Sequence, residues 1–187
     1  MRILDTFTTS AWSGGTNTQL YIHPEGATLK EQNFSFRLST ATIEQSPAVF
    51  TPLSSKIRRA FMLMEGQVTL QHERRDPVSL KPYEITHFNG ADHITSMGQG
   101  VPFNLMTTEV LAVALDHHSL SVSQNLQLSP NNTNQMLLVY LHKGTADIFN
   151  PNGTLHQKQG QLLVSTGETV RLKATSACEA IYVRVDL

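Results

Sequence analysis

The chain has 187 residues, of which 40% are hydrophobic and 16% are charged, so it can bury a core and carries too few charges to remain disordered. A formal net charge of -1 excludes the strongly basic surface of most nucleic-acid-binding proteins. The longest apolar runs, residues 111–115 and 136–141, are far shorter than the roughly 20 residues that span a bilayer, and the first residues lack the apolar core of a signal peptide. We therefore expect a cytoplasmic protein with neither nucleic acid nor a membrane as a partner.

Short runs rich in Val, Ile, Thr and aromatic residues recur along the chain, and turns containing Gly, Pro, Asn and Asp separate them. No long stretch keeps the 3.6-residue apolar period of a helix. The sequence therefore predicts an all-β protein with strands, in chain order, at residues 18–22, 34–43, 59–64, 68–72, 85–88, 104–108, 136–141, 145–149, 161–165 and 180–185. Residues 150–153, with the sequence NPNG, are predicted to form a hairpin loop.

A faint internal repeat relates two parts of this pattern. Residues 62–70, MLMEGQVTL, are echoed by residues 139–148, VYLHKGTADI, which aligns Gly66 with Gly144. Each copy has a strand, a glycine turn and a second strand, so we expect two antiparallel β-barrels or jelly rolls, an architecture that includes the cupins. The two pseudo-repeats would span about 1–115 and 116–187 of a single 1–187 unit. The alternative is two unrelated hairpins, since glycine turns are common in β proteins.

Four segments of the first half form an ordered set of motifs: WSGGTNTQL at 12–20, FRLSTA at 36–41, Arg59 ahead of Gly66, and FNLM at 103–106. In this order they resemble the motifs of the HutD/Ves family. The resemblance implies a bicupin-like fold of the RmlC-like cupin type, an association with histidine utilisation for the HutD branch, and no established catalytic activity. The chain departs from the family pattern on both sides of the fourth motif, where Pro102 precedes Phe103 and Thr107 follows Met106.

The segment from Trp12 to Gly15 has two alternative interpretations. Two glycines let the backbone turn sharply, so that successive N–H groups beside the indole would bind an anionic ligand. Alternatively, the glycines form an ordinary turn before the strand that contains Thr18, and Trp12 covers one end of a barrel. We take Trp12, Gly14, Gly15 and Thr18 as candidate ligand-binding residues.

Two arginines present a choice between structural and ligand-binding roles. Strand alternation separates Arg37 and Ser39 from the apolar face of residues 34–43, so Arg37 is either a solvated cation or lies at a barrel mouth, where its planar guanidinium suits a carboxylate. Arg59 lies on an otherwise apolar face and needs a partner. That partner is either a protein carboxylate such as Glu65 or an acidic ligand.

Asn104 and Met106 share a face of their strand because they are two residues apart. The amide would orient a ligand, and the thioether would pack against it. Alternatively, both residues lie at the rim of the core, with Asn104 hydrogen-bonded to the backbone.

The chain contains eight histidines, but none of them forms the His-x-His pair that catalytic cupins use to bind a metal. His117 and His118 are adjacent and point to opposite faces of a strand, whereas His87 and His93 are spaced singly. We therefore expect neither a metal nor another cofactor. Cys178 is the only cysteine, and we expect a small buried side chain there.

Three classes of function remain at this stage. We expect a non-catalytic or regulatory binding protein for a small carboxylate-bearing metabolite, such as an N-formyl or formimino amino acid, held between Trp12, Arg37, Arg59 and Asn104. The second class is a cupin-type enzyme. It would be either metal-dependent or a metal-free isomerase with His87 or His93 as the general base. The third is a structural or interaction protein, and a homodimer is compatible with it.

Overall fold

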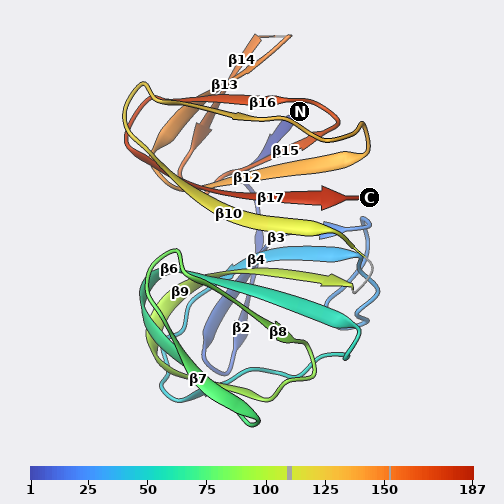
Figure 1. Ribbon diagram of the computed structural model, residues 1–187, viewed down its shortest axis with the longest axis vertical. Helices are drawn as coiled ribbons and strands as arrows, with labels where there is room; N and C mark the ends of the chain where they lie inside the picture. The colour runs from blue at the N-terminus through green and yellow to red at the C-terminus, as the bar shows by residue number, and fades with distance from the viewer. Residues whose placement is uncertain (109–110, 152) are drawn as a thin grey trace. The chain divides into compact units, whose positions relative to one another are not determined.

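The computed structural model describes residues 1–108, 111–151 and 153–187. Within these ranges every element of regular secondary structure is a β-strand (Figure 1). The all-β prediction is confirmed. No helix in the described ranges is long and apolar enough to cross a membrane. The chain divides into two compact units: one comprises Phe7–Val110, and the other combines Met1–Thr6 with Leu111–Leu187. We call them the N-terminal lobe and the C-terminal lobe.

The N-terminal lobe is built on two long strands that pair with each other over their whole length. Its strands are β2 (Thr8–Trp12), β3 (Gly15–His23), β4 (Phe36–Ala41), β5 (Ala48–Val49), β6 (Ile57–His72), β7 (Arg75–Leu80), β8 (Ile85–Asn89) and β9 (Ile94–Thr108). The first half of β6 and the second half of β9 lie in a sheet with β8, β4, β3 and β2. The other halves of β6 and β9 pair with β7 and β5. An apolar core that includes Phe50, Phe61 and Phe88 contains side chains from both layers.

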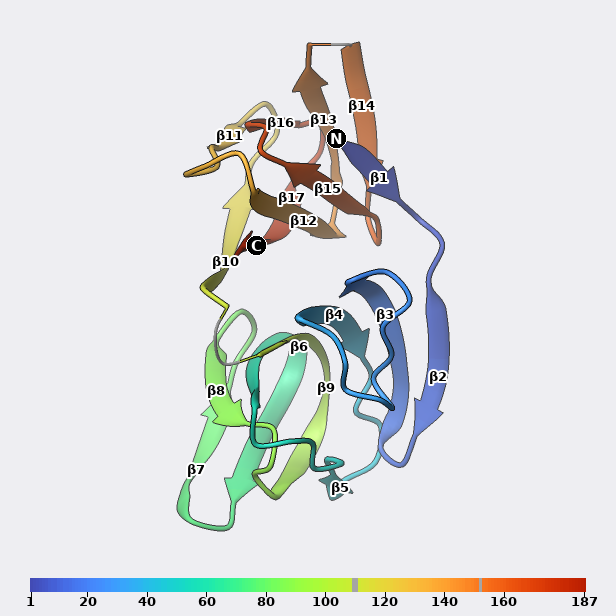
Figure 2. The same ribbon diagram turned by 90° about the vertical axis from the view of Figure 1, so that its right-hand side faces the viewer.

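The C-terminal lobe consists of two antiparallel sheets (Figure 2). Its strands are β1 (Arg2–Leu4), β10 (Val113–Leu120), β11 (Asn125–Leu128), β12 (Gln135–Lys143), β13 (Thr145–Asn150), β14 (Gly153–Lys158), β15 (Leu162–Thr166), β16 (Val170–Ala174) and β17 (Cys178–Asp186). One sheet has the order β1-β15-β12-β17-β10, and the other has the order β11-β16-β13-β14. Leucine and valine side chains of both sheets form one core cluster.

The strand pairings of the two lobes correspond element by element. The path β8-β6-β9-β4 of the N-terminal lobe has the same connectivity as β15-β12-β17-β10, and the path β5-β9-β6-β7 corresponds to β11-β16-β13-β14. The register shifts at equivalent points, between Leu63 and Glu65 in β6 and between Leu141 and Lys143 in β12. The two lobes therefore share one strand connectivity, and they are jelly rolls with open sheets rather than closed barrels.

The aligned glycines mark the corner at which each repeat passes from one sheet to the other. Gly66 has φ of 89° and Gly144 has φ of 84°, a conformation that glycine adopts most readily. A Cβ at Gly66 would collide with the carbonyl oxygen of Gln99, and one at Gly144 would collide with that of Ala177. The strand that crosses each corner therefore passes too close to the glycine for any side chain to fit.

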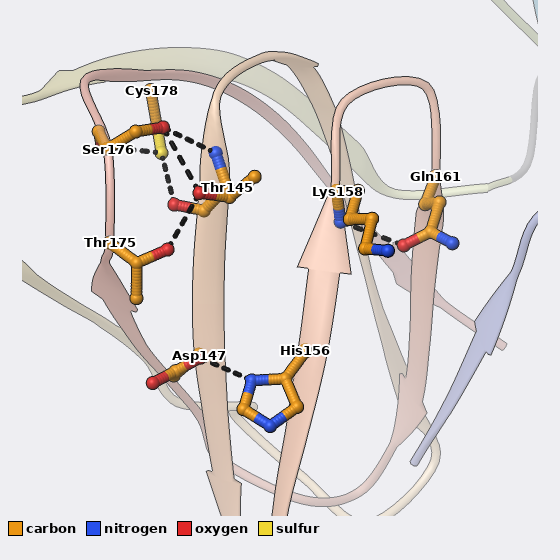
Figure 3. A network of polar contacts seen from close by, with 8 residues as sticks. All are labelled: Thr145, Asp147, His156, Lys158, Gln161, Thr175, Ser176 and Cys178. Carbon is orange, nitrogen blue, oxygen red and sulfur yellow. Dashed lines mark hydrogen bonds and ion pairs between the residues drawn. The ribbon is translucent and has the colours of Figure 1, made fainter.

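Hydrogen bonds connect the residues on both sides of the Gly144 corner (Figure 3). The Thr145 N–H donates to Ser176 Oγ at 2.9 Å, and the Thr145 and Thr175 hydroxyls lie 2.7 Å apart. The Cys178 thiol donates to the carbonyl oxygens of Thr145 and Ser176 at 3.0 and 3.1 Å. Burial raises the pKa of this thiol, which disfavours the reactive thiolate. The expectation that Cys178 is a small buried side chain is confirmed.

Several strand boundaries differ from the prediction. The two predicted strands at 59–64 and 68–72 are one continuous β6, because Gly66 bends the strand without ending it. The strand predicted at 104–108 begins at Ile94. The hairpin between β13 and β14 is confirmed by the pairing of Asn150 with Gly153, although Asn152 itself lies outside the described residues.

Candidate ligand-binding site

Three adjacent strands of the N-terminal lobe, β4, β9 and β6, place two arginines in one row. Arg37 of β4 pairs with Met106 of β9, and Met106 pairs on its other side with Arg59 of β6. Directly opposed residues of neighbouring strands project from the same face of a sheet. The next row along this face consists of Ser39, Asn104 and Phe61.

A cavity of about 540 Å³ is lined by residues of this face. Its polar lining includes Asn17, Arg37, Arg59 and Asn104. Its apolar lining includes Trp12, Ile43, Phe50, Phe61 and Met106. Two loops also contribute to the wall, through Leu29, Lys30 and Gln32 and through residues 50–53. The structure thus brings together five of the residues singled out in the sequence: Trp12, Arg37, Arg59, Asn104 and Met106.

Arg37 is only 3% exposed, so the alternative of a solvated cation is wrong. Its Nε donates to Gln19 Oε1 at 2.9 Å, its Nη1 to Ser39 Oγ at 3.0 Å, and its Nη2 to Asn17 Oδ1 at 2.7 Å. All three acceptors are neutral. Burial lowers the pKa of Arg37 to about 10, so the side chain remains protonated at neutral pH with no negative charge beside it. Ser39 therefore supports Arg37 and is not part of the cavity lining.

Arg59 is 8% exposed, and its guanidinium lies over two aromatic rings. Its Cζ is 5.3 Å from the Phe50 ring centroid and 4.9 Å from that of Phe88, both within cation–π range. Its Nε is buried and makes no hydrogen bond. Burial, and then the charge of Arg37, lower the pKa of Arg59 to about 10.

A buried cation usually has a carboxylate partner, and the described residues provide none for either arginine. Within the described part of the chain, no Asp or Glu forms an ion pair with either guanidinium. Glu65, the partner considered from the sequence, is exposed at the bulge of β6 and does not pair with Arg59. Two protonated guanidinium groups therefore line one cavity, and no anion of the described residues neutralises them.

Asn104 places a second unpaired polar atom at the cavity. The side chain is 5% exposed, and its Oδ1 is buried without a hydrogen-bond partner. The alternative of an Asn104 side chain bonded to the backbone is therefore wrong for this oxygen. Met106, between the two arginines, packs with Ala27, Phe34 and Ile57, so its thioether forms part of the cavity wall.

The glycines of the first motif do not line the cavity. A Cβ at Gly14 would collide with the Trp12 ring, and one at Gly15 would meet the carbonyl oxygen of Thr42, so both glycines allow close packing. Trp12 itself lines the cavity, and its Nε1 donates to the carbonyl oxygens of Thr16 and Thr42, each at 3.2 Å.

Thr18 lies on the opposite face of β3 from the cavity. Its hydroxyl is 2.8 Å from that of Thr9, whereas its neighbours Asn17 and Gln19 hold Arg37. Asn17 and Gln19 were missed at the sequence level. The alternation that separates them from Thr18 was the available signal, because residues two apart share a face of a strand.

The histidines considered as general bases lie elsewhere. His87 and His93 are exposed, and neither is among the residues that line this cavity. In the described ranges, no group of three or more His, Cys, Asp and Glu side chains is placed to hold a metal ion. The cavity offers guanidinium donors to an anion, and it offers the Asn104 amide oxygen to a hydrogen-bond donor.

Comparisons with known proteins are consistent with this architecture. A family model described as HutD matches residues 4–182. A conserved protein of unknown function from Pseudomonas aeruginosa PAO1 is 18% identical, with a TM-score of 0.84 over 100% of this chain and 98% of that one. HutD from Pseudomonas fluorescens SBW25, described as a formate condition, is 17% identical, with a TM-score of 0.71 over 97% of each chain. YhhW from Escherichia coli is 11% identical, with a TM-score of 0.74 over 98% of this chain and 97% of that one.

At these identities the solved structures show a shared fold, and they support the bicupin-like prediction. No curated protein sequence gives a significant match to the chain.

Proposed function

The chain belongs to the HutD family, and we propose that it is a non-catalytic binding protein that holds a small carboxylate-bearing metabolite in the cavity of its N-terminal lobe. The observation that carries the proposal is the pair Arg37 and Arg59, two buried cations without a carboxylate partner in the described residues. An uncompensated buried charge destabilises a folded protein. A carboxylate ligand would supply the missing negative charge and accept two hydrogen bonds from a guanidinium.

The unpaired atoms indicate which ligand groups would bind. Arg59 Nε is a donor without an acceptor, and Asn104 Oδ1 is an acceptor without a donor. Arg37 uses three of its five N–H groups within the protein, so two remain for a ligand. An N-formyl or formimino amino acid carries a carboxylate one carbon away from an N–H group. Its carboxylate would accept hydrogen bonds from the arginines, and its N–H would donate to Asn104.

The proposal is tested by thermal unfolding and calorimetric titration with formate, acetate and N-formyl amino acids. A ligand present at 100 times its Kd stabilises the native state by about 2.7 kcal/mol, which raises the Tm of a domain of this size by about 5 to 10 °C. Arg59→Met should abolish this response because it removes the unpaired donor and one positive charge. Lys56→Met removes the same charge from an exposed side chain outside the cavity and should retain the response. The proposal fails if no carboxylate shifts the wild-type Tm, or if Arg59→Met responds as fully as the wild type.

A further inference from the structure

The cavity has far more apolar wall than a carboxylate and an amide need. Its apolar lining includes Trp12, Ile43, Phe50, Phe61, Pro102 and Met106. A volume of about 540 Å³ lies within the range of pockets that enclose drug-sized molecules. N-formylglycine, the smallest candidate of the proposed class, would leave most of this wall in contact with water.

Two loops add further apolar residues to the cavity wall. Leu29 and Leu53 line the cavity and pack against the core cluster that contains Phe34. The Ser54 N–H donates to Gln32 Oε1 at 2.7 Å, which ties the two loops together. The apolar wall is therefore preformed and does not need to be assembled by the ligand.

A third cation among the lining residues, Lys30, is exposed, so it does not form a second buried site for an anion. An exposed ion pair contributes little to affinity because water and salt screen it, whereas burial of one leucine-sized side chain contributes substantially more. Apolar contact is thus the larger source of affinity for whatever group extends from the carboxylate.

We infer that the ligand is amphipathic: an N-acyl amino acid whose carboxylate lies between Arg37 and Arg59 and whose side chain is apolar and lies against Phe50, Phe61 and Leu29. This inference rests on the proposed function, and it narrows the substrate class of the same site. An acidic side chain or an imidazole placed against these three residues would exchange water for apolar surface and would lose hydrogen bonds there.

The test compares wild-type affinities for N-formylglycine, N-formylleucine and N-formylasparagine, the last being close in shape to the leucine derivative but polar. N-formylleucine should bind about 10- to 100-fold more tightly than N-formylglycine, the ratio expected for burying one aliphatic side chain. N-formylasparagine should gain little over N-formylglycine. Equal affinities for all three would overturn the inference while leaving the proposed function intact, and no binding of any carboxylate would overturn the proposed function itself.

N-formylglutamate provides the opposing case. If it binds more tightly than N-formylleucine, and if Lys30→Met removes that advantage, the cavity selects a second carboxylate and the inference is wrong. A matched pair of variants tests the wall directly. Leu29→Asn should reduce the preference for N-formylleucine over N-formylasparagine by about fourfold or more, the equivalent of one methylene group. Val49→Thr, at an exposed apolar residue outside the cavity lining, should leave the preference unchanged.

Discussion

Replacing Arg59 with methionine should make the ligand-free protein more stable, even though it removes a buried and well-packed side chain. Arg59 is charged, buried and unpaired at its Nε, and it lies near a second buried cation, Arg37. Methionine has a similar length, no charge and a sulfur atom that packs well against the Phe50 and Phe88 rings. A residue retained for ligand binding at the expense of stability behaves in this way.

The expected magnitude follows from the pKa of the buried group. Burial and the charge of Arg37 lower the pKa of Arg59 from 12.5 to about 10, and each pKa unit corresponds to about 1.4 kcal/mol. Because the folded-state pKa is the lower one, the charge destabilises the folded state by about 3 kcal/mol at all pH values below about 10, and this effect fades only as the pH rises above that value. Loss of two cation–π contacts removes roughly 0.5 to 1 kcal/mol each. The net gain in the free energy of unfolding is therefore about 1 to 2 kcal/mol, a Tm increase of about 2 to 8 °C.

Urea and thermal denaturation of the protein, after dialysis into a carboxylate-free buffer, measure this gain directly. Lys56→Met is the matched control, because its side chain is exposed, and its free energy of unfolding should remain within about 0.5 kcal/mol of the wild type. A loss of stability in Arg59→Met would refute the reasoning. It would mean that the guanidinium is compensated within the protein and that the case for a missing anion is unsound.

Gly66→Ala and Gly144→Ala should each destabilise their lobe by more than Gly26→Ala does, as measured by urea denaturation. All three glycines have positive φ, which costs a substituted residue about 1 to 2 kcal/mol, but a Cβ meets backbone only at the two corners and finds nothing within 4 Å at Gly26. Equal losses at all three positions would show that the close strand crossing contributes nothing. Elemental analysis of the purified protein should find less than one equivalent of iron, zinc, nickel or manganese, and a stoichiometric metal whose removal lowers the Tm would favour the enzyme hypothesis.

Sequence reasoning located the two arginines because local periodicity determines the face of a strand. Alternation alone placed Arg37 opposite its apolar neighbours and Arg59 on an apolar face, and the register confirms both assignments. What alternation cannot determine is which strands are neighbours. The order β4-β9-β6 brings together segments far apart in sequence, and only this pairing puts Met106 between the two arginines. Long-range pairing therefore turns two separate cations into one candidate site.

The sequence was less informative where one side chain had two local interpretations. The glycine pair at 14–15 suggested an anion-binding turn. In the structure the Trp12 ring packs against Gly14 and the Thr42 carbonyl oxygen packs against Gly15. The strand pattern could not show either contact. The strand pattern left open whether Arg37 is a solvated cation, yet Arg37 is buried and hydrogen-bonded to three neighbours. Arg37→Ala would therefore leave the side-chain acceptors of Gln19, Ser39 and Asn17 without a donor. Substitution of Arg59 tests the site without this additional loss.

The repeat leads to a final prediction, that each chain binds one ligand and not two. When the lobes are aligned on their corner glycines and bulges, Leu137 takes the place of Arg59, and its partner Arg184 takes the place of Met106. Leu137 is fully buried in the apolar core, and Arg184 Nη1 already donates to the Ser129 carbonyl oxygen at 2.6 Å. The position equivalent to Arg37 is Ala114, so the C-terminal lobe has no counterpart of the two-arginine row. Calorimetric titration should therefore give a stoichiometry of one per chain, and Arg184→Met should bind as the wild type does. A stoichiometry of two, reduced to one by Arg184→Met, would show instead that the shared jelly-roll framework, and not the arginine pair, creates the site.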